Sequence, residues 1–192
     1  LKLSPHSSLA LDAYANLLLF AYGRLDKAVA VLDDALALDP LSPALHSDLG
    51  VFYYYSGQFD RAIASFRKSV DLDNNFFWAR LNLGWCYFFI GETNEALATF
   101  ENMVQAAPDS PYLQQALGYA YGVSGRRAEA LEVLAKLDQL GKTRYIPPSA
   151  QAYVYLGLGQ REVALDWLEK AYAERDSEMI FLRSEPPLAP LR

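Results

Sequence analysis

The sequence predicts an all-α fold in which helical hairpins of one constant length stack side by side. Three observations predict it: glycines recur every 34 residues, alanines recur five residues after each of them, and the intervening segments carry apolar residues at helical spacing. With 11 glycines in 192 residues, five in one register arise by chance with odds of about 10⁻⁶ per register. The register consists of Gly23, Gly57, Gly91, Gly125 and Gly159, followed by Ala28, Ala62, Ala96, Ala130 and Ala164.

The third repeat shows how each unit divides into two helices. Its first helix is predicted over residues 77–90, where Leu81, Trp85 and Phe88 form one apolar stripe. Gly91 then ends the helix, because glycine adopts the left-handed conformation of a helix terminus without a Cβ clash. The equivalent glycines predict the same turn in every repeat.

The second helix of this repeat is predicted from Thr93, whose hydroxyl is expected to cap it, to the neighbourhood of Pro108. Ala96 lies where this helix crosses the first, since a small residue lets two backbones approach. Small residues at three further positions, Gly50, Gly84 and Gly118, are expected to allow close approach between helices.

The pattern resembles the tetratricopeptide repeat (TPR) family, whose motif runs Trp-x-x-Leu-Gly-x-x-Tyr and continues with Gly, Ala, Phe and Pro. The matching places hold Leu49-Gly50-x-x-Tyr53, Leu83-Gly84-x-x-Tyr87 and Leu117-Gly118-x-x-Tyr121, with Phe66 and Phe100 in the second helices. The resemblance covers about residues 9–176 and implies a right-handed α-solenoid of helix-turn-helix hairpins in a single domain over residues 1–192. Repeats are predicted at 9–42, 43–76, 77–110, 111–144 and 145–176. Asn16 and Ala152 replace the tight glycine in the first and fifth.

The end of the chain has a narrower resemblance to TPR arrays in prokaryotic multidomain regulatory proteins. Tyr145-Ile146-Pro147-Pro148 and residues 164–172 and 181–192 carry it. The usual closing segment, Asp-Pro-x-Phe-x-Pro-Leu-Arg, is Glu185-Pro186-Pro187-Leu188 here. This resemblance implies a part of a larger regulatory protein. Leu1-Lys2-Leu3-Ser4-Pro5 is interpreted as the end of a preceding repeat, so that the chain would be a fragment.

The family resemblance also implies a binding groove, because in TPR proteins the first helix of each hairpin lines a concave face. Rigid aromatic side chains supply large contact areas and dominate binding hot spots. The alternative is that some of these rings only pack between neighbouring helices. The groove positions are Leu17, Phe20, Val51, Tyr54, Tyr55, Trp78, Leu81, Trp85, Phe88, Phe89, Tyr112, Tyr119, Tyr153 and Leu156.

Some family members grip a terminal carboxylate with Lys, Arg and Asn. The corresponding positions here are Ser47, Val51, Leu81 and Asn82, so only the Asn is kept. An apolar extended peptide or an amphipathic helix is therefore the expected ligand, with an affinity that depends little on salt.

The tail over residues 177–192 begins with the apolar Met179-Ile180-Phe181-Leu182 and then becomes proline-rich. Three alternatives are open for it. It caps the last hairpin, it fills the groove or pairs with another copy, or it is disordered.

Charge and composition weigh against several function classes. The net charge is -6 and both signs are scattered, whereas nucleic-acid binding needs a clustered basic face. Cys86 is the only cysteine, which excludes an intrachain disulfide and zinc spacings such as Cys-x-x-Cys. The apolar run over residues 85–90 is far shorter than the roughly 20 residues of a membrane-spanning helix. We expect no nucleic-acid partner, no membrane insertion, no metal and no cofactor.

Other polar motifs are interpreted structurally. Asp71-x-Asp73-x-Asn75 resembles the start of a calcium loop, but Phe76 stands at the required glycine, so an ordinary helix exit is expected. His6 and His46 have no paired nucleophile or acid, and Cys86 is expected to be a small core residue.

The sequence therefore predicts a non-catalytic scaffold for protein–protein interaction, located in the cytoplasm. The alternative is a homo-oligomerisation module that uses the same apolar surface. An enzyme would need acids, bases or metal ligands converging from separate repeats, and the predicted groove is nearly free of them.

Overall fold

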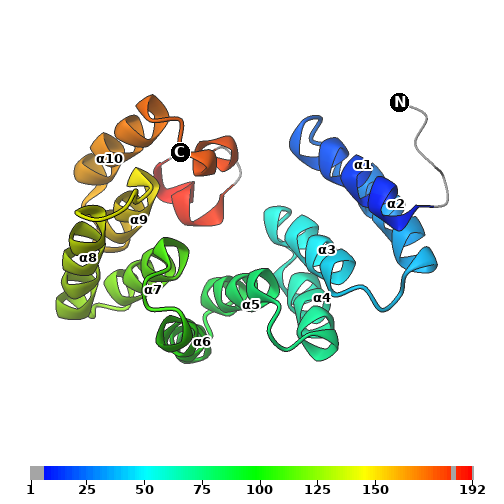
Figure 1. Ribbon diagram of the computed structural model, residues 1–192, viewed down its shortest axis with the longest axis horizontal. Helices are drawn as coiled ribbons and strands as arrows, with labels where there is room; N and C mark the ends of the chain where they lie inside the picture. Colours follow the sequence, from blue (N-terminus) through cyan, green and yellow to red (C-terminus); the bar gives the residue numbers. More distant parts are fainter. Residues whose placement is uncertain (1–6, 183–184, 192) are drawn as a thin grey trace. The chain divides into compact units, whose positions relative to one another are not determined.

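The computed structural model describes residues 7–182 and 185–191. This part of the chain forms ten α-helices and two 3-10 helices, and contains no strand (Figure 1). Leu1-Lys2-Leu3-Ser4-Pro5 and His6 lie outside the described residues. The α-helices are α1 (Ser8–Phe20), α2 (Leu25–Leu38), α3 (Pro43–Tyr55), α4 (Phe59–Leu72), α5 (Phe77–Phe89), α6 (Thr93–Ala106), α7 (Pro111–Val123), α8 (Arg127–Gly141), α9 (Pro148–Gly157) and α10 (Arg161–Ala173).

Each predicted repeat range holds a pair of α-helices. Each glycine of the 34-residue register lies between the two helices of its pair and has a positive φ, between 62° at Gly23 and 88° at Gly91. Only glycine adopts this conformation without strain, so the turn requires it. The all-α helical-repeat architecture is therefore confirmed.

The start of α6 differs from the prediction. Thr93 is its first helical residue, and the capping position is Glu92, whose side chain makes no capping hydrogen bond. The expected role of the Thr93 hydroxyl is therefore wrong, because the residue already has helical geometry. Serine caps occur instead at α1 and α3, where Ser42 Oγ accepts a hydrogen bond from the Leu45 amide at 3.4 Å.

The chain divides into two compact units, residues 1–90 and 91–192, each with its own core. In the first unit, Leu32 and Phe66 are fully buried second-helix residues. A Cβ atom on Gly50 would lie 2.6 Å from the ring of Phe66. The predicted close approach at Gly50 is therefore confirmed, and α3 and α4 pack through it.

In the second unit, α7 and α9 cross at glycines. A Cβ atom on Gly157 would lie 2.5 Å from the Tyr119 carbonyl oxygen, and one on Gly122 would lie 2.5 Å from the Gly157 carbonyl carbon. At Gly118, where the sequence predicted a close approach, an added Cβ atom would lie 2.6 Å from the Val154 side chain. Glycine therefore lets these two backbones touch.

The tail folds back onto α9 and α10 through the 3-10 helices η1 (Ser177–Phe181) and η2 (Pro186–Leu191), as Figure 1 shows. Buried Asp176 fixes its start: one carboxylate oxygen accepts from the Ser149 amide and the other from the Glu178 amide, both at 3.0 Å. Leu188 is only 2% exposed. The described part of the tail therefore packs against the last hairpin.

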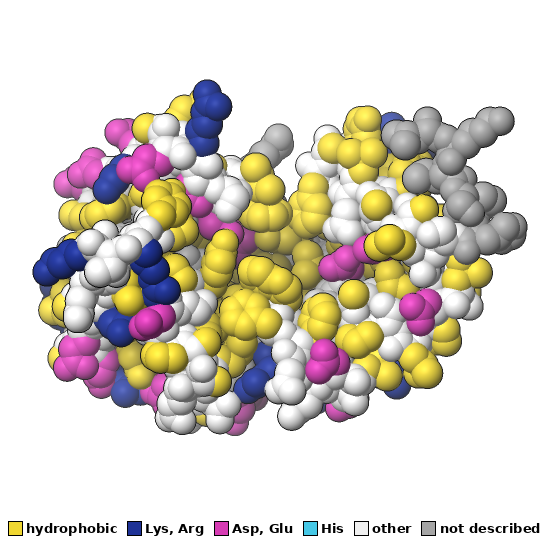
Figure 2. All heavy atoms as spheres, in the orientation of Figure 1, with side chains coloured by type: hydrophobic (Ala, Val, Ile, Leu, Met, Phe, Trp, Pro, Cys, Tyr) yellow, Lys and Arg dark blue, Asp and Glu magenta, His cyan; other side chains and the backbone are white. Residues whose placement is uncertain are grey.

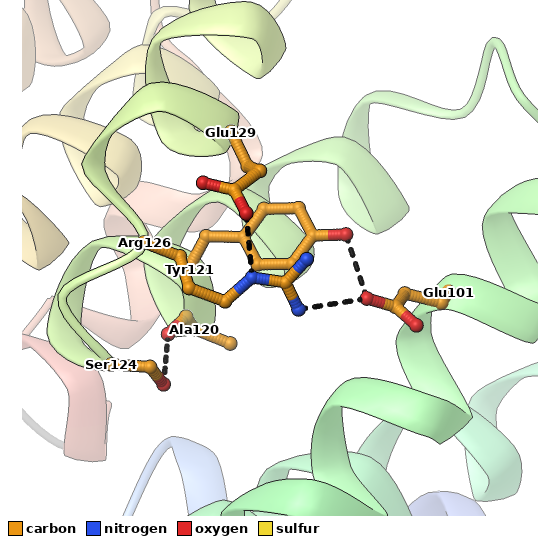
Figure 3. A network of polar contacts seen from close by, with 6 residues as sticks. All are labelled: Glu101, Ala120, Tyr121, Ser124, Arg126 and Glu129. Atoms are coloured by element: carbon orange, nitrogen blue, oxygen red, sulfur yellow. Dashed lines mark hydrogen bonds and ion pairs between the residues drawn. The ribbon is translucent and has the colours of Figure 1, made fainter.

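Polar contacts join successive hairpins at one repeated position. Arg67 of α4 donates to the Tyr87 hydroxyl of α5 at 3.1 Å, and one period later Glu101 of α6 accepts from the Tyr121 hydroxyl of α7 at 2.8 Å. Figure 3 shows the second contact, in which Arg126 lies over the Tyr121 ring and also donates to Glu101 at 3.2 Å. Burial and this Glu101 hydrogen bond raise the pKa of Tyr121 to about 12. We call the repeat position held by Arg67 and Glu101 the polar lock position, because its side chain hydrogen-bonds to the first helix of the next hairpin.

Candidate binding surface

The structure places the predicted groove residues in three classes of exposure. The most exposed are Leu17 at 48%, Phe20 at 44% and Trp78 at 50%. Val51, Tyr55, Phe88, Phe89 and Tyr112 are half-buried, whereas Tyr54, Leu81, Trp85, Tyr119, Tyr153 and Leu156 are buried. The buried residues therefore fit the alternative that the rings only pack between neighbouring helices. The exposed and half-buried residues are still predicted to contact a ligand.

The first unit holds a connected group of rings, which we call the aromatic cluster: Phe20, Tyr54, Tyr55, Phe59, Trp85, Phe88 and Phe89. At one end, the ring centroids of Phe20 and Tyr55 are 5.7 Å apart, in an edge-to-face arrangement. At the other end, Phe89 stacks on Phe59 at 5.4 Å and on Trp85 at 6.2 Å. Such pairs add about 0.5–1.5 kcal/mol beyond area burial, so the exposed rings rest on a rigid base.

Phe59 was missed because it lies in a second helix, outside the positions that the family assigns to the groove. It begins α4, and its ring also contacts Tyr54 at 6.0 Å. The equivalent residues in the other repeats are Leu25, Thr93, Arg127 and Arg161, so the repeat itself does not mark this position as aromatic. An aromatic residue two places after a turn glycine was the signal that could have found it.

Trp78 lies near the start of α5. Its ring packs edge-to-face on Phe77 at 5.1 Å, while half of the side chain stays exposed. A large ring that is held in place yet open to solvent can bind without losing much conformational freedom.

An acidic pair lies on the seam between α1 and α3. Asn16 donates to Asp12 at 3.1 Å and to Asp48 at 3.2 Å, so the amide joins the two carboxyl groups. Burial and the neighbouring Asp48 raise the pKa of Asp12 to about 7, because two close carboxylates resist simultaneous ionisation. Asp12, Asn16 and Phe20 follow one another at four-residue spacing on α1, so the pair and the Phe20–Tyr55 contact lie on the same side of this helix, about two turns apart. Sequence reasoning missed this pair.

The predicted groove residues of the second unit mostly serve packing. Tyr119 and Tyr153 are 5% and 2% exposed, and burial raises the pKa of Tyr119 to about 12. Tyr112, at the start of α7, is half-buried. The close α7–α9 crossing explains the burial of Tyr119, whose backbone lies against Gly157.

The residues set aside in the sequence have structural roles. His46 Nε2 lies 3.0 Å from the Pro40 carbonyl oxygen, and Asp73 accepts from the Asn75 amide at 2.9 Å, as in a turn. Cys86 is buried, and burial raises its pKa to about 12, which disfavours the reactive thiolate. Over the described residues, no group of three or more His, Cys, Asp or Glu side chains is placed to hold a metal ion.

Surface charge is scattered on the face that Figure 2 shows. Hydrophobic side chains occupy much of that face, and Lys and Arg lie among Asp and Glu instead of forming one basic patch. In the portion of the chain that can be described, each helix is too short or too polar to cross a membrane.

Three solved structures with similar folds have TM-scores of 0.59 to 0.68. MamA from residue 41 onward, from Desulfovibrio magneticus RS-1, is 20% identical with a TM-score of 0.62, over 89% of this chain and 96% of that one. YrrB, described as a TPR protein with an unusual peptide-binding site, is 21% identical with a TM-score of 0.59, over 93% of this chain and 92% of that one. PilW, described as a widely conserved type IV pilus biogenesis factor, is 19% identical with a TM-score of 0.68, over 98% of this chain and 84% of that one.

No curated protein matches the sequence. A family model does match it. The family model for the tetratricopeptide repeat matches residues 19–65 and 54–118. The two matches together span residues 19–118, which is just over half of the 192 residues. The chain therefore belongs to the tetratricopeptide repeat family.

Proposed function

We propose that this chain is a non-catalytic protein-interaction scaffold that binds an apolar extended peptide or an amphipathic helix on its first unit. The observation that carries the proposal is the exposure of three large apolar side chains in the first unit: Leu17 and Phe20 on α1, of which Phe20 belongs to the aromatic cluster, and Trp78 on α5. An exposed group of large apolar side chains is typical of a protein-binding surface. YrrB, a structural relative with a peptide-binding site, gives further support.

The arrangement of the rings favours binding by burial of apolar area. Tyr54 and Trp85 are nearly inaccessible, so they support the half-buried rings of Tyr55 and Phe89 and are not themselves available to a ligand. A preorganised surface loses little entropy on binding. Burial of apolar area also depends little on ionic strength, in contrast to a carboxylate clamp.

A peptide-display selection on the wild-type protein tests the proposal. We expect the selected peptides to be rich in apolar residues, with affinities that change little when the salt concentration is raised. Phe20→Ala and Trp78→Ala should each weaken the best peptide by about 1 kcal/mol or more, or about fivefold in Kd. Both side chains are partly exposed, so the fold should be kept.

The matched control is Tyr145→Ala, which removes a ring that is 61% exposed in the second unit. This variant should bind the selected peptides as the wild type does. Wild-type affinity in both Phe20→Ala and Trp78→Ala, with the helical circular dichroism intact, would contradict the proposed surface.

Homo-oligomerisation is the second candidate function. One observation favours it: on α1, Leu9 is 75% exposed and Leu17 is 48% exposed. Light scattering across a concentration series separates the candidates. A stable dimer that buries these residues would show twice the monomer mass and would bind the selected peptides only weakly.

The wider context belongs to the same proposal. A cytoplasmic location and a place within a larger regulatory protein follow from the resemblance of the chain's end to TPR arrays of prokaryotic regulators. A protein or peptide is the proposed partner, and neither nucleic acid nor a membrane is.

A further inference from the structure

The outer face of α10 repeats a stripe that earlier second helices carry where they pack on the next hairpin. α4 packs against α5, and α6 packs against α7. The α10 residues of the stripe lie two 34-residue periods after those of α6 and three after those of α4. The stripes are Ile63, Phe66, Arg67 and Val70 on α4; Leu97, Phe100, Glu101 and Val104 on α6; and Leu165, Leu168, Glu169 and Tyr172 on α10.

The third member of each stripe is the polar lock position. Arg67 meets the Tyr87 hydroxyl and Glu101 meets the Tyr121 hydroxyl, in each case on the first helix of the following hairpin. Glu169 occupies this position on α10 and is a hydrogen-bond acceptor like Glu101. The face therefore has the chemistry to hold a helix that brings a donor.

The described residues of the tail cover this face only in part. A cavity of about 390 Å³ remains between α10 and the tail, lined by the four α10 residues of the stripe and by four apolar tail residues, Leu188 among them. This volume lies within the usual range of roughly 300–1,000 Å³ for binding pockets. Leu165 is 46% exposed and Tyr172 is 77% exposed, against 7% for Ile63.

The exposure of Leu165, the first residue of the α10 stripe, would not by itself distinguish this face from the equivalent face of α8. Leu131 holds the same repeat position on α8 and is 44% exposed, although α9 follows it. However, the α8 lock position is Ala135, which offers no side-chain acceptor, and Leu131 does not line the cavity. The cavity and the acceptor together set α10 apart.

We propose that this pocket is a second docking site, which receives an amphipathic helix of a partner protein. Apolar side chains of that helix fill the cavity over Leu165 and Leu168, and a hydroxyl or cationic donor meets Glu169. The helix continues the contact that joins α6 to α7. A second copy's α1 fits less well, because the residue at its equivalent of Tyr121 is Leu19, which carries no donor.

A stapled helical peptide that copies residues 111–123 is the probe, because the equivalent stripe of α6 packs against this segment in α7. Fluorescence anisotropy measures its binding to the full chain. We expect Leu165→Asp to weaken the complex at least tenfold. A peptide with Tyr121→Phe should bind the wild type about three- to tenfold more weakly, yet bind Glu169→Ala no more weakly than the unmodified peptide does.

Leu131→Asp is the matched control, since it adds the same charge at an equally exposed leucine of the same repeat position. It should bind the probe as the wild type does, and so should the Phe20→Ala, Trp78→Ala double variant. Equal loss in Leu131→Asp and Leu165→Asp, or no binding by the wild type at about 1 mM peptide, would overturn the inference. Weaker probe binding in the Phe20→Ala, Trp78→Ala double variant alone would also overturn the inference. That result would place the probe on the proposed surface of the first unit and so support that proposal.

Discussion

Asp12 is the residue whose ionisation most directly links the candidate surface to stability. Its pKa is raised to about 7 by burial and by Asp48, so the folded protein holds a proton that the unfolded chain releases near pH 4. The free energy of unfolding contributed by this group is therefore greatest at acidic pH and falls as the pH rises from about 4 to about 7.

Replacing Asp12 with Asn removes this penalty and keeps an acceptor for Asn16. We expect Asp12→Asn to be more stable than the wild type by about 1–2 kcal/mol at pH 8, after allowance for partial solvent exposure, with a smaller difference at pH 4. Urea denaturation at both pH values measures it. Asp34→Asn, at an exposed position of α2, is the control and should show no such pH dependence. A variant that is equally destabilised at both pH values would rule out the raised pKa of Asp12 as a source of instability at high pH.

Individual side chains also show where sequence reasoning reaches its limit. The turn glycines could be predicted, because a positive φ restricts the residue type and the restriction repeats. The Asp12–Asp48 pair and the role of Phe59 could not, because each depends on which side chains two neighbouring helices bring together. Burial of Tyr54 and Trp85 has the same origin: their rings fill the space beneath their neighbours.

Among the helices, the α7–α9 crossing is the contact most sensitive to a single methyl group. Gly157→Ala should destabilise the protein by about 1–3 kcal/mol, because its Cβ would lie 2.5 Å from the Tyr119 carbonyl oxygen, and backbone atoms cannot rotate away. Thermal unfolding measures the loss. Gly141→Ala in α8 is the matched control, since its Cβ would meet nothing closer than Ile146 at 3.9 Å. Equal stability of the two variants would show that the crossing is looser than described.

The two helices of the third repeat lie close to the bounds predicted from the sequence, whereas helix contacts were predicted only in part. The 34-residue register and the proline and glycine positions located every hairpin, since turn chemistry is local. Gly50 and Gly118 were also recognised as close-approach positions, and the structure confirms both. Gly122 and Gly157 were not, because they lie outside the repeated motif and matter only where α7 meets α9.

At the scale of the whole molecule, the two units differ in what they offer a partner. The first unit exposes rings on its first helices, whereas the second buries Tyr119 and Tyr153 and leaves its open apolar face on α10. A repeat array has no single active centre, so each exposed face of a hairpin can take its own partner. We therefore propose peptide binding on the first unit and helix docking on the last hairpin.

The chain's three tryptophans allow the central claim to be tested in one spectrum. Trp78 lies on the proposed surface, Trp85 lies beneath it, and Trp167 lies on α10 under Lys170. With 5-fluorotryptophan incorporated, the ¹⁹F resonance of Trp78 should shift most as a selected apolar peptide is added, while that of Trp167 stays in place. A saturating peptide that leaves the Trp78 resonance unmoved would contradict the account.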